Sequence, residues 1–384
     1  MKTHFPVDRM RAEATPFYYY DMELLDATIK AIRQYSDYPD FQVHYAVKAN
    51  SNPEILRRIA ASGLGADTVS IGEVKAALDA GFSAAKTVFA GVGKTDEEIA
   101  AALEYGIGCF NVESEPELFV IESIARQMGK KAPVALRVNP EIDAHTHHYI
   151  TTGIAENKFG IAMSMLRRVI DSCIKSEWID LQGLHFHIGS QVTDLTPYKI
   201  LCERINRLQE EYSDIEFASI NVGGGLGVDY DNPDTNPIPD FEEFFKIFHE
   251  NLKLRSGQQV HFELGRAVVA QCGSLITRVV FVKEGVDKKF VILDGGMTEL
   301  IRPALYQAHH KIENLTSTSP DEERYDVVGP ICESSDTFGT DELLPETKRG
   351  DLVALRSAGA YGEVMASCYN CRSLPGSRFS HRFR

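Results

Sequence analysis

The sequence predicts an α/β protein in which a (β/α)8 barrel of the TIM type is followed by a second, mainly β domain. From about residue 42, short apolar runs rich in β-branched residues alternate with longer segments of helical period. Eight such alternations are typical of a closed parallel barrel. After residue 270, strand-like runs follow one another with Gly-rich turns and little helical pattern, which predicts the β domain.

The expected barrel strands are short and separated by amphipathic segments such as SEPELFVIESIARQMG. In order, they are residues 42–47, 66–70, 87–91, 109–113, 134–139, 181–188, 218–222 and 259–264. An open doubly wound sheet is the alternative, but no GxGxxG turn follows the first strand. The closed barrel is therefore favoured.

The domain boundaries follow from the change, along the chain, from alternating strand and helix patterns to successive strand-like runs. We expect residues 29–270 to form the barrel and residues 271–384 the β domain. The strand-like run TPFYYYD precedes the barrel, so residues 1–28 are expected to pair with the β domain. The ending SLPGSRFSHRFR carries three arginines and is interpreted as a solvated tail.

Charge and composition exclude several classes of partner. The chain has 40 basic and 55 acidic residues, a formal net charge of −15, and no long basic run, so nucleic acid and anionic membrane surfaces are not expected as partners. No apolar stretch approaches the roughly 20 residues that cross a bilayer, and the N-terminus has no signal-peptide core. The seven scattered cysteines favour reduced thiols over a disulfide framework. We expect a cytoplasmic location.

Polar residues and glycines follow the expected strands at their carboxyl ends, where barrel enzymes have their active sites. Lys48 follows the first strand, within YAVKAN. Burial there would lower the pKa of its amine and suit Schiff-base chemistry. A lysine that extends to solvent at the barrel mouth is the alternative.

The glycine-rich run NVGGGLG (221–227) follows the seventh strand, where barrel proteins commonly bind phosphate. Consecutive backbone N–H groups without side chains form a plausible phosphate cradle. The same run is also compatible with a simple tight turn.

Histidines and cysteines raise the question of a metal. His185 and His187 are two residues apart on an expected strand and face the same side. They could bind a metal, form a satisfied core pair, or include one imidazole that stacks on an aromatic cofactor. Cys368 and Cys371 form one CxxC without a second ligand pair, and His145, His147 and His148 lie on an expected loop without a fixed spacing. No metal site is predicted.

Taken together, the motifs resemble the fold-type III pyridoxal-phosphate-dependent decarboxylases, whose fold is that of alanine racemase, and within them the diaminopimelate decarboxylases. The resemblance extends from TPFYYYD to YNCR, nearly the whole chain. Its segments are HYAVKANSN (44–52), GADTVSIGE (65–73), NKFGI (157–161), HFHIGSQ (185–191), NVGGGLG, LDGGMTELIRPALY (293–306), GPICESSDTF (329–338) and GAYG (359–362). The family usually has Glu-Pro-Gly-Arg where this chain has Glu-Leu-Gly-Arg at 263–266.

The resemblance implies pyridoxal 5'-phosphate as the cofactor. Lys48 resembles the lysine that forms the Schiff base, His187 the histidine stacked on the pyridine ring, and Glu263 the carboxylate that keeps the pyridine nitrogen protonated. The implied cofactor-binding residues are Lys48, His187, Ser190, Gly224, Gly225, Glu263, Gly265, Arg266 and Tyr361. The implied substrate-binding residues are Arg266, Arg302, Tyr306, Glu333 and Tyr361, and Cys332 matches the proton donor.

The activity implied by the resemblance is decarboxylation of meso-2,6-diaminopimelate, at its D-configured centre, to L-lysine and CO2, the last step of lysine biosynthesis. Arg302 would hold the distal carboxylate and Glu333 would complement the ammonium. The resemblance also implies a homodimer with shared active sites, in which the partner contributes the Cys332–Glu333 segment. The alternatives are a related decarboxylase acting on ornithine, arginine or carboxynorspermidine, a non-catalytic pyridoxal-phosphate carrier, and a metal-dependent barrel hydrolase.

Overall fold

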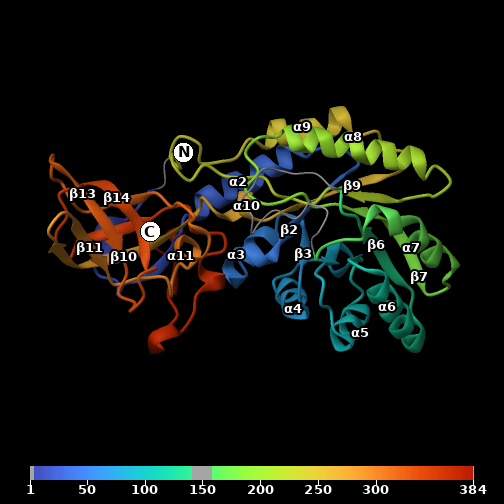
Figure 1. Ribbon diagram of the computed structural model, residues 1–384, viewed down its shortest axis with the longest axis horizontal. Helices are drawn as coiled ribbons and strands as arrows, with labels where there is room; N and C mark the ends of the chain where they lie inside the picture. The colour runs from blue at the N-terminus through green and yellow to red at the C-terminus, as the bar shows by residue number, and fades with distance from the viewer. Residues whose placement is uncertain (1–3, 141–157, 384) are drawn as a thin grey trace. The chain divides into compact units, whose positions relative to one another are not determined.

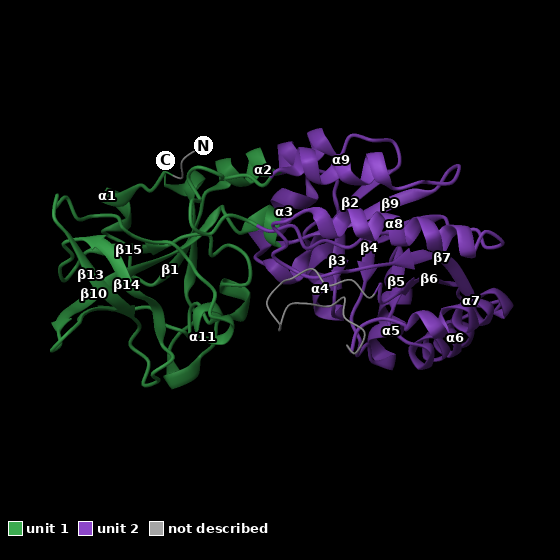
Figure 2. Cartoon of the chain, turned by 45° about the horizontal axis from the view of Figure 1, so that its top comes forward, with its two compact units in different colours: residues 1–28, 228–239, 266–384 green, residues 29–227, 240–265 purple. Residues whose placement is uncertain are grey.

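The computed structural model describes residues 4–140 and 158–383. The chain divides into two compact units (Figure 2). Unit 2 comprises residues 29–227 and 240–265, and unit 1 comprises residues 1–28, 228–239 and 266–384. His145, His147 and His148 lie outside the described residues.

Unit 2 contains the closed parallel barrel (Figure 1). Each strand pairs with the next, and the last pairs with the first, with Phe41 opposite Val260 and Tyr45 opposite Leu264. The strands are β2 (Phe41–Ala46), β3 (Gly65–Thr68), β4 (Thr87–Phe89), β5 (Cys109–Val112), β6 (Ala132–Arg137), β7 (Ile179–His185), β8 (Ser219–Asn221) and β9 (Gln259–Leu264). All eight predicted barrel strands are confirmed, with ends displaced by a few residues.

Several helices between the strands begin at capping residues. Ser70 and Ser114 cap their helices through side-chain oxygens, and Thr95 forms a capping box with Glu98. The helices are α2 (Met22–Tyr35), which begins in unit 1, and α3 (Pro53–Ala60), α4 (Ile71–Asp79), α5 (Asp96–Tyr105), α6 (Glu115–Met128), α7 (Met163–Lys175), α8 (Thr196–Glu211) and α9 (Phe241–Asn251). The capping residues follow the carboxyl ends of strands, so they place polar side chains at that rim of the barrel.

An aromatic cluster packs helix α9 against strand β9. The sequence FEEFFKIF places four phenylalanines on one helical face, and all four are buried. The Phe262 ring lies 5.0 Å from the Phe245 ring and 5.1 Å from the Phe248 ring, both edge to face. This packing fixes β9, the strand that carries Glu263 at its end.

Unit 1 is built around a β-sheet with the strand order β12-β15-β10-β11-β13-β14. The strands of this order are β10 (Gly273–Glu284), β11 (Lys289–Leu293), β12 (Ile312–Asn314), β13 (Glu322–Val328), β14 (Thr337–Pro345) and β15 (Leu352–Leu355). The short helices of the unit are α1 (Val7–Met10), α10 (Arg266–Val269) and α11 (Arg302–Tyr306). The predicted mainly β second domain is thus confirmed.

Both ends of the chain join this sheet. Strand β1 (Phe17–Tyr20) pairs antiparallel with β10 and parallel with β16 (Gly376–Phe379). The interpretation of the arginine-rich ending as a solvated tail is therefore wrong. Phe379 stacks on Tyr20, and the Arg378 guanidinium pairs with Glu13 at 2.9 Å, so this part of the ending is held against the N-terminal segment.

The observed unit boundary differs from the expected one at residue 270. Residues 228–239 and the chain from Arg266 onward belong to unit 1. The side chain of Gln271 donates hydrogen bonds to the backbone carbonyls of Asp229 and Asn236, at 3.0 and 3.1 Å. These bonds tie the 228–239 segment to the start of the β unit.

Two further properties can be read from the described residues. No disulfide joins any of the seven cysteines. Among the helices described, none is long and apolar enough to cross a membrane.

Candidate active site

Lys48 lies directly beyond the first barrel strand. It is the central residue of a short 3-10 turn, Val47–Ala49, that follows β2. Its side chain is 41% exposed, and its Nζ lies 3.9 Å from Oδ2 of Asp67. The side chain is therefore only partly buried, and its role as the Schiff-base lysine stays a prediction.

Asp67 on β3 is a buried carboxyl group beside this lysine. Burial raises its pKa well above the usual range, the negative charge of Glu263 raises it further, and the positive charge of Lys48 only partly offsets both. Its Oδ1 atom has no hydrogen-bond partner among the described residues. These effects shift Asp67 toward its protonated form.

Glu263, at the end of β9, is held by three side-chain contacts. Its Oε1 accepts hydrogen bonds from the amides of Asn111 and Asn221, at 2.9 and 2.8 Å. Its Oε2 lies 3.0 Å from Nε2 of His185. A carboxylate has about four lone-pair directions, so this arrangement leaves one on Oε2 for a further donor.

The environment of Glu263 favours its ionised form. Burial by itself would raise its pKa, but the interaction with His185, including its hydrogen bond, and the positive charge of Lys48 hold the pKa well below the usual range. Asp67 and Glu263 are thus two neighbouring carboxyl groups whose pKa values are driven apart. Such pairs are typical of sites where one acid stays neutral and the other stays charged.

The two barrel histidines have different partners. His185 is paired with Glu263, whereas His187 lies beyond the end of β7 and accepts a hydrogen bond from the Gly224 N–H at 3.4 Å. Burial lowers the pKa of His187 well below its usual value, and the charges of Arg137 and Lys48 lower it further. Its imidazole is therefore neutral. Among the described residues, no group of three or more potential ligands could hold a metal ion.

The glycine run after β8 requires glycine at each of its first positions. Gly223 and Gly225 have φ values of 73° and 101°, in the left-handed region. A Cβ at Gly224 would lie 1.8 Å from the carbonyl oxygen of Glu263, and one at Gly225 would lie 2.5 Å from that of Gly189. The loop therefore packs directly against the loop that carries Ser190, which is half-buried.

Other rim residues have structural partners. Ser70 caps helix α4, and the Glu73 carboxylate accepts the Val69 N–H at 2.9 Å. The Arg137 guanidinium pairs with Glu113 at 2.6 Å. These side chains hold the turns at the carboxyl ends of the strands.

Two of the predicted substrate-binding arginines meet in unit 1. Nη1 of Arg266 lies 2.6 Å from the hydroxyl of Tyr230, and Nη1 of Arg302 lies 3.0 Å from the same oxygen. Arg266 and Arg302 are 7% and 6% exposed. The structure thus brings together two predicted residues through a tyrosine that the sequence analysis did not single out.

Tyr361 lies beside the same arginines. Its φ of 56° is unusual for a residue other than glycine, and such strain is common at functional sites. The guanidinium carbon of Arg266 lies 5.0 Å from the centre of the Tyr361 ring. The preceding Gly359 admits no side chain, because a Cβ there would lie 1.9 Å from the carbonyl oxygen of Val269. This close approach fixes the loop that carries Tyr361.

The remaining predicted residues of unit 1 lie on more exposed elements. Tyr306 is half-buried at the end of α11. Cys332 and Glu333 lie on an exposed turn that Asp336 supports by accepting the Ile331 N–H at 2.7 Å. The Glu333 carboxylate accepts a hydrogen bond from Tyr369 at 2.7 Å.

Some residues of the site were not found by sequence reasoning. Asn111 lies in the middle of the expected strand 109–113 and Asn221 near the end of the expected strand 218–222, so polar side chains within apolar strands were an available signal. Tyr230 and His310 lie in segments without periodicity, and no local pattern marks them. Gly265 was predicted, and a Cβ there would approach Ala46 and Ala49 at 3.0 and 3.1 Å.

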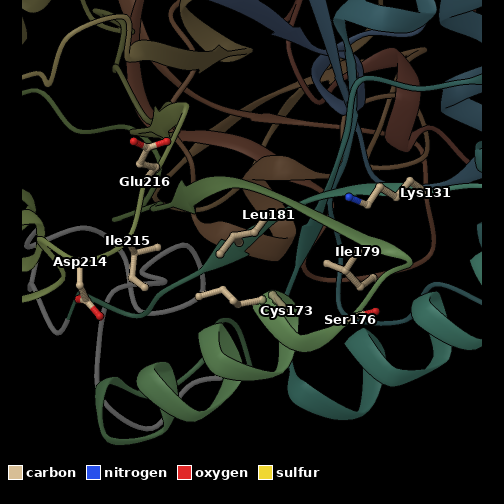
Figure 3. A pocket seen from close by; sticks show the side chains of 9 residues that line it. Lys131, Cys173, Ser176, Ile179, Leu181, Asp214, Ile215 and Glu216 are labelled. Carbon is tan, nitrogen blue, oxygen red and sulfur yellow. The ribbon is translucent and has the colours of Figure 1, made fainter.

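A cavity of about 280 Å³ lies elsewhere in the barrel unit (Figure 3). Its lining includes Lys131, Ile179 and Glu216, which lie at or before the amino-terminal ends of barrel strands. Barrel active sites lie at the opposite, carboxyl-terminal ends. The cavity is therefore separate from the candidate site.

Comparison with known proteins gives a family for this arrangement. Residues 25–270 match the family of pyridoxal-dependent decarboxylases, in the pyridoxal-binding domain. A diaminopimelate decarboxylase from Bacteroides thetaiotaomicron is 59% identical over 98% of this chain and 98% of its own length. That from Aquifex aeolicus is 40% identical over 93% of this chain and 84% of its own length.

Known structures give the same result. Diaminopimelate decarboxylase from Helicobacter pylori, in complex with L-lysine, has a TM-score of 0.92 and 39% identity, over 97% of this chain and 93% of that one. A lysine/ornithine decarboxylase from Vibrio vulnificus, in complex with cadaverine, has a TM-score of 0.84 over 97% of this chain and 96% of that one. Its 23% identity supports the fold alone.

Proposed function

Since the chain belongs to the diaminopimelate decarboxylases, a branch of the pyridoxal-dependent decarboxylases, we propose that it converts meso-2,6-diaminopimelate to L-lysine and CO2. This reaction is the last step of lysine biosynthesis by the diaminopimelate route. The observation that carries the proposal is the ionised Glu263, fixed by Asn111, Asn221 and His185 at the mouth of the barrel. A buried carboxylate with one remaining acceptor direction suits a ring nitrogen that must stay protonated.

The residues at the barrel mouth fit pyridoxal 5'-phosphate. When bound, this cofactor supplies a ring that withdraws electrons from the reacting carbon. Lys48 would hold it covalently, and the neutral His187 imidazole suits stacking on the cationic ring, because it adds no charge repulsion. We assign cofactor binding to Lys48, His187, Ser190, Gly224, Gly225, Glu263, Gly265, Arg266 and Tyr361.

Fewer backbone N–H groups of the glycine run are available for phosphate than the sequence suggests. The Gly223 N–H donates to Oδ1 of Asn221 at 2.9 Å, and the Gly224 N–H donates to Nδ1 of His187 at 3.4 Å. Within the glycine run we therefore assign the main phosphate contact to the Gly225 N–H, and Ser190 remains an assigned cofactor residue.

We assign recognition of the amino-acid substrate to residues of unit 1. Arg302 is suited to the distal carboxylate, because a guanidinium can hold a carboxylate through two parallel hydrogen bonds. Arg266, Tyr306 and Tyr361 complete the assigned substrate residues in this unit, and Glu333 would complement the distal ammonium. Ornithine has no distal carboxylate, so a buried Arg302 favours diaminopimelate over ornithine.

Cys332 is assigned as the proton donor to the carbon that has lost CO2. Its exposure on a turn is compatible with a homodimer in which the partner receives the Cys332–Glu333 segment. Replacing the thiol, in Cys332→Ala, should abolish most turnover and leave cofactor absorbance intact. Unchanged turnover would remove Cys332 from this role.

The homodimer and a cytoplasmic location are also part of the proposal. All seven cysteines are unpaired, as expected in a reducing compartment. Sedimentation of the holoenzyme at micromolar concentration tests the dimer, and a monomer that is fully active would exclude shared sites.

The activity is tested by measuring CO2 release from separate candidate substrates. We expect rapid release from meso-diaminopimelate and little from ornithine, arginine or carboxynorspermidine. Faster release from any of these three would replace the proposed substrate. No release from any of the four, with the cofactor bound, would favour a carrier.

A further inference from the structure

Tyr230 joins the two buried arginines of unit 1. It comes from the 228–239 segment, and its hydroxyl oxygen lies 2.6 Å from Arg266 and 3.0 Å from Arg302. A guanidinium only donates hydrogen bonds, so the phenol oxygen accepts both. Burial alone would raise the pKa of Tyr230, but the charges of Arg266 and Arg302 bring it below its usual value. The oxygen is thus a polarised acceptor shared by two cations.

His310 holds Arg302 from another direction. Its Nδ1 lies 2.8 Å from the carbonyl oxygen of Arg356, and its Nε2 lies 2.9 Å from Nη1 of Arg302. Because a carbonyl only accepts, Nδ1 carries the hydrogen and Nε2 is the acceptor. Burial lowers the pKa of His310 to about 3, so the ring stays neutral at physiological pH. The two rings are edge to face, with Tyr230 and His310 centred 5.2 Å apart.

These contacts determine which edge of Arg302 remains for a ligand. Nη1 carries two hydrogens, and Tyr230 and His310 accept both of them. The edge formed by Nε and Nη2 is left, and this edge matches the two oxygens of a carboxylate. Among the described residues, the side-chain hydrogen-bond partners of Arg302 are the uncharged Tyr230 and His310 and none is a carboxylate, so its buried charge calls for an anion from a ligand.

We propose that Tyr230 is a positioning residue for specificity, whose hydroxyl locks Arg302 in the orientation that accepts the substrate's distal carboxylate. The inference rests on the proposed function, in which Arg302 binds that carboxylate. Tyr230 acts through the arginine and selects ligands that carry a carboxylate over those that carry only an amine.

Two ligands of the holoenzyme test this selection. L-lysine carries a carboxylate and cadaverine carries none, while both have a terminal amine. Tyr230→Phe removes the hydroxyl and keeps the ring. We expect it to weaken L-lysine binding at least about tenfold, the effect of losing one hydrogen bond to a charged group, and to leave cadaverine binding unchanged. The KM for meso-diaminopimelate should rise similarly, with a smaller change in kcat.

Matched variants make the result interpretable. Tyr19→Phe also removes one buried tyrosine hydroxyl from unit 1, where it donates to the His4 carbonyl at 3.0 Å, and it should change neither affinity. His310→Leu removes the second acceptor of Arg302 and should reproduce the selective loss of L-lysine. It serves as the test if Tyr230→Phe does not fold.

The outcomes separate this inference from the proposed function. If the wild type fails to decarboxylate meso-diaminopimelate, the proposed function is wrong. If the wild type is active but Tyr230→Phe binds L-lysine normally, or loses L-lysine and cadaverine equally, the positioning role of Tyr230 is wrong.

Discussion

The hydrogen-bond network around Glu263 makes a quantitative prediction about stability. Asn111 is 1% exposed and donates to Oε1 of Glu263 at 2.9 Å. Replacing it with leucine, Asn111→Leu, keeps a similar volume and removes the donor. A hydrogen bond to a charged group contributes about 1.5–3 kcal/mol, so the free energy of unfolding of the apo protein at pH 7 should fall by about 2 kcal/mol. Asn221 and His185 would still support the carboxylate.

The free energy of this hydrogen bond also predicts a change in the pKa of Glu263. At about 1.36 kcal/mol for each pKa unit, the loss of this donor should raise the pKa of Glu263 by about one to two. The pKa of Glu263 in the folded protein is lowered, so its carboxylate stabilises the fold above its unfolded pKa of about 4.3. This stabilisation is lost as the pH falls through the folded pKa. Acid unfolding of Asn111→Leu should therefore begin at a higher pH than that of the wild type.

A double-mutant cycle tests whether the charge of Glu263 is the cause. The assay is urea denaturation at pH 7 of four apo proteins: wild type, Asn111→Leu, Glu263→Gln and the double variant. With a neutral acceptor in Glu263→Gln, the leucine substitution should cost only about 1 kcal/mol. Asn206→Leu, which loses a donor to the Asn251 carbonyl at 2.8 Å, should cost the same in both backgrounds. An equal cost of Asn111→Leu in both backgrounds would refute the reasoning.

Two further predictions concern packing and pH. Gly224→Ala places a Cβ 1.8 Å from the Glu263 carbonyl oxygen and should lower the free energy of unfolding, measured by urea denaturation, by about 3 kcal/mol. In the control Gly93→Ala, the new Cβ meets no atom within 4 Å, and the loss should stay under about 0.5 kcal/mol. Equal losses in the two variants would contradict the packing. The pKa of His310 in the folded protein is lowered to about 3, so as the pH falls below about 6.5 this residue binds a proton in the unfolded chain but not in the folded protein. The free energy of unfolding should therefore fall by about 2 kcal/mol between pH 6.5 and 5 because of this residue. His310→Gln should lose that part of the slope while the exposed control His381→Gln keeps it, and identical slopes in all three proteins would exclude His310 as the source.

The barrel could be predicted from sequence because its signals are local. Each strand is a short apolar run between amphipathic helices, and β9 carries Glu263 within such a run. The residues at the carboxyl ends of the strands were then expected to share one rim, as Lys48 and Asp67 do at 3.9 Å. The resemblance added roles that periodicity alone does not contain.

The parts that sequence reasoning missed depend on contacts between distant segments. Tyr230 meets Arg302 across 72 positions of the chain, and no spacing rule connects them. The 228–239 segment was assigned to the barrel because it follows a barrel strand, yet hydrogen bonds from Gln271 hold it in unit 1. The C-terminal strand was missed because its arginines suggested solvent, whereas β1 provides a pairing edge far away in sequence.

The most direct test is to find which amine holds the cofactor. The purified protein, loaded with pyridoxal 5'-phosphate, is reduced with borohydride, digested, and its modified peptide is identified by mass spectrometry. We expect one label, on Lys48, together with visible absorbance before reduction that Lys48→Ala lacks. A label on another lysine, or no label, would contradict the proposed site.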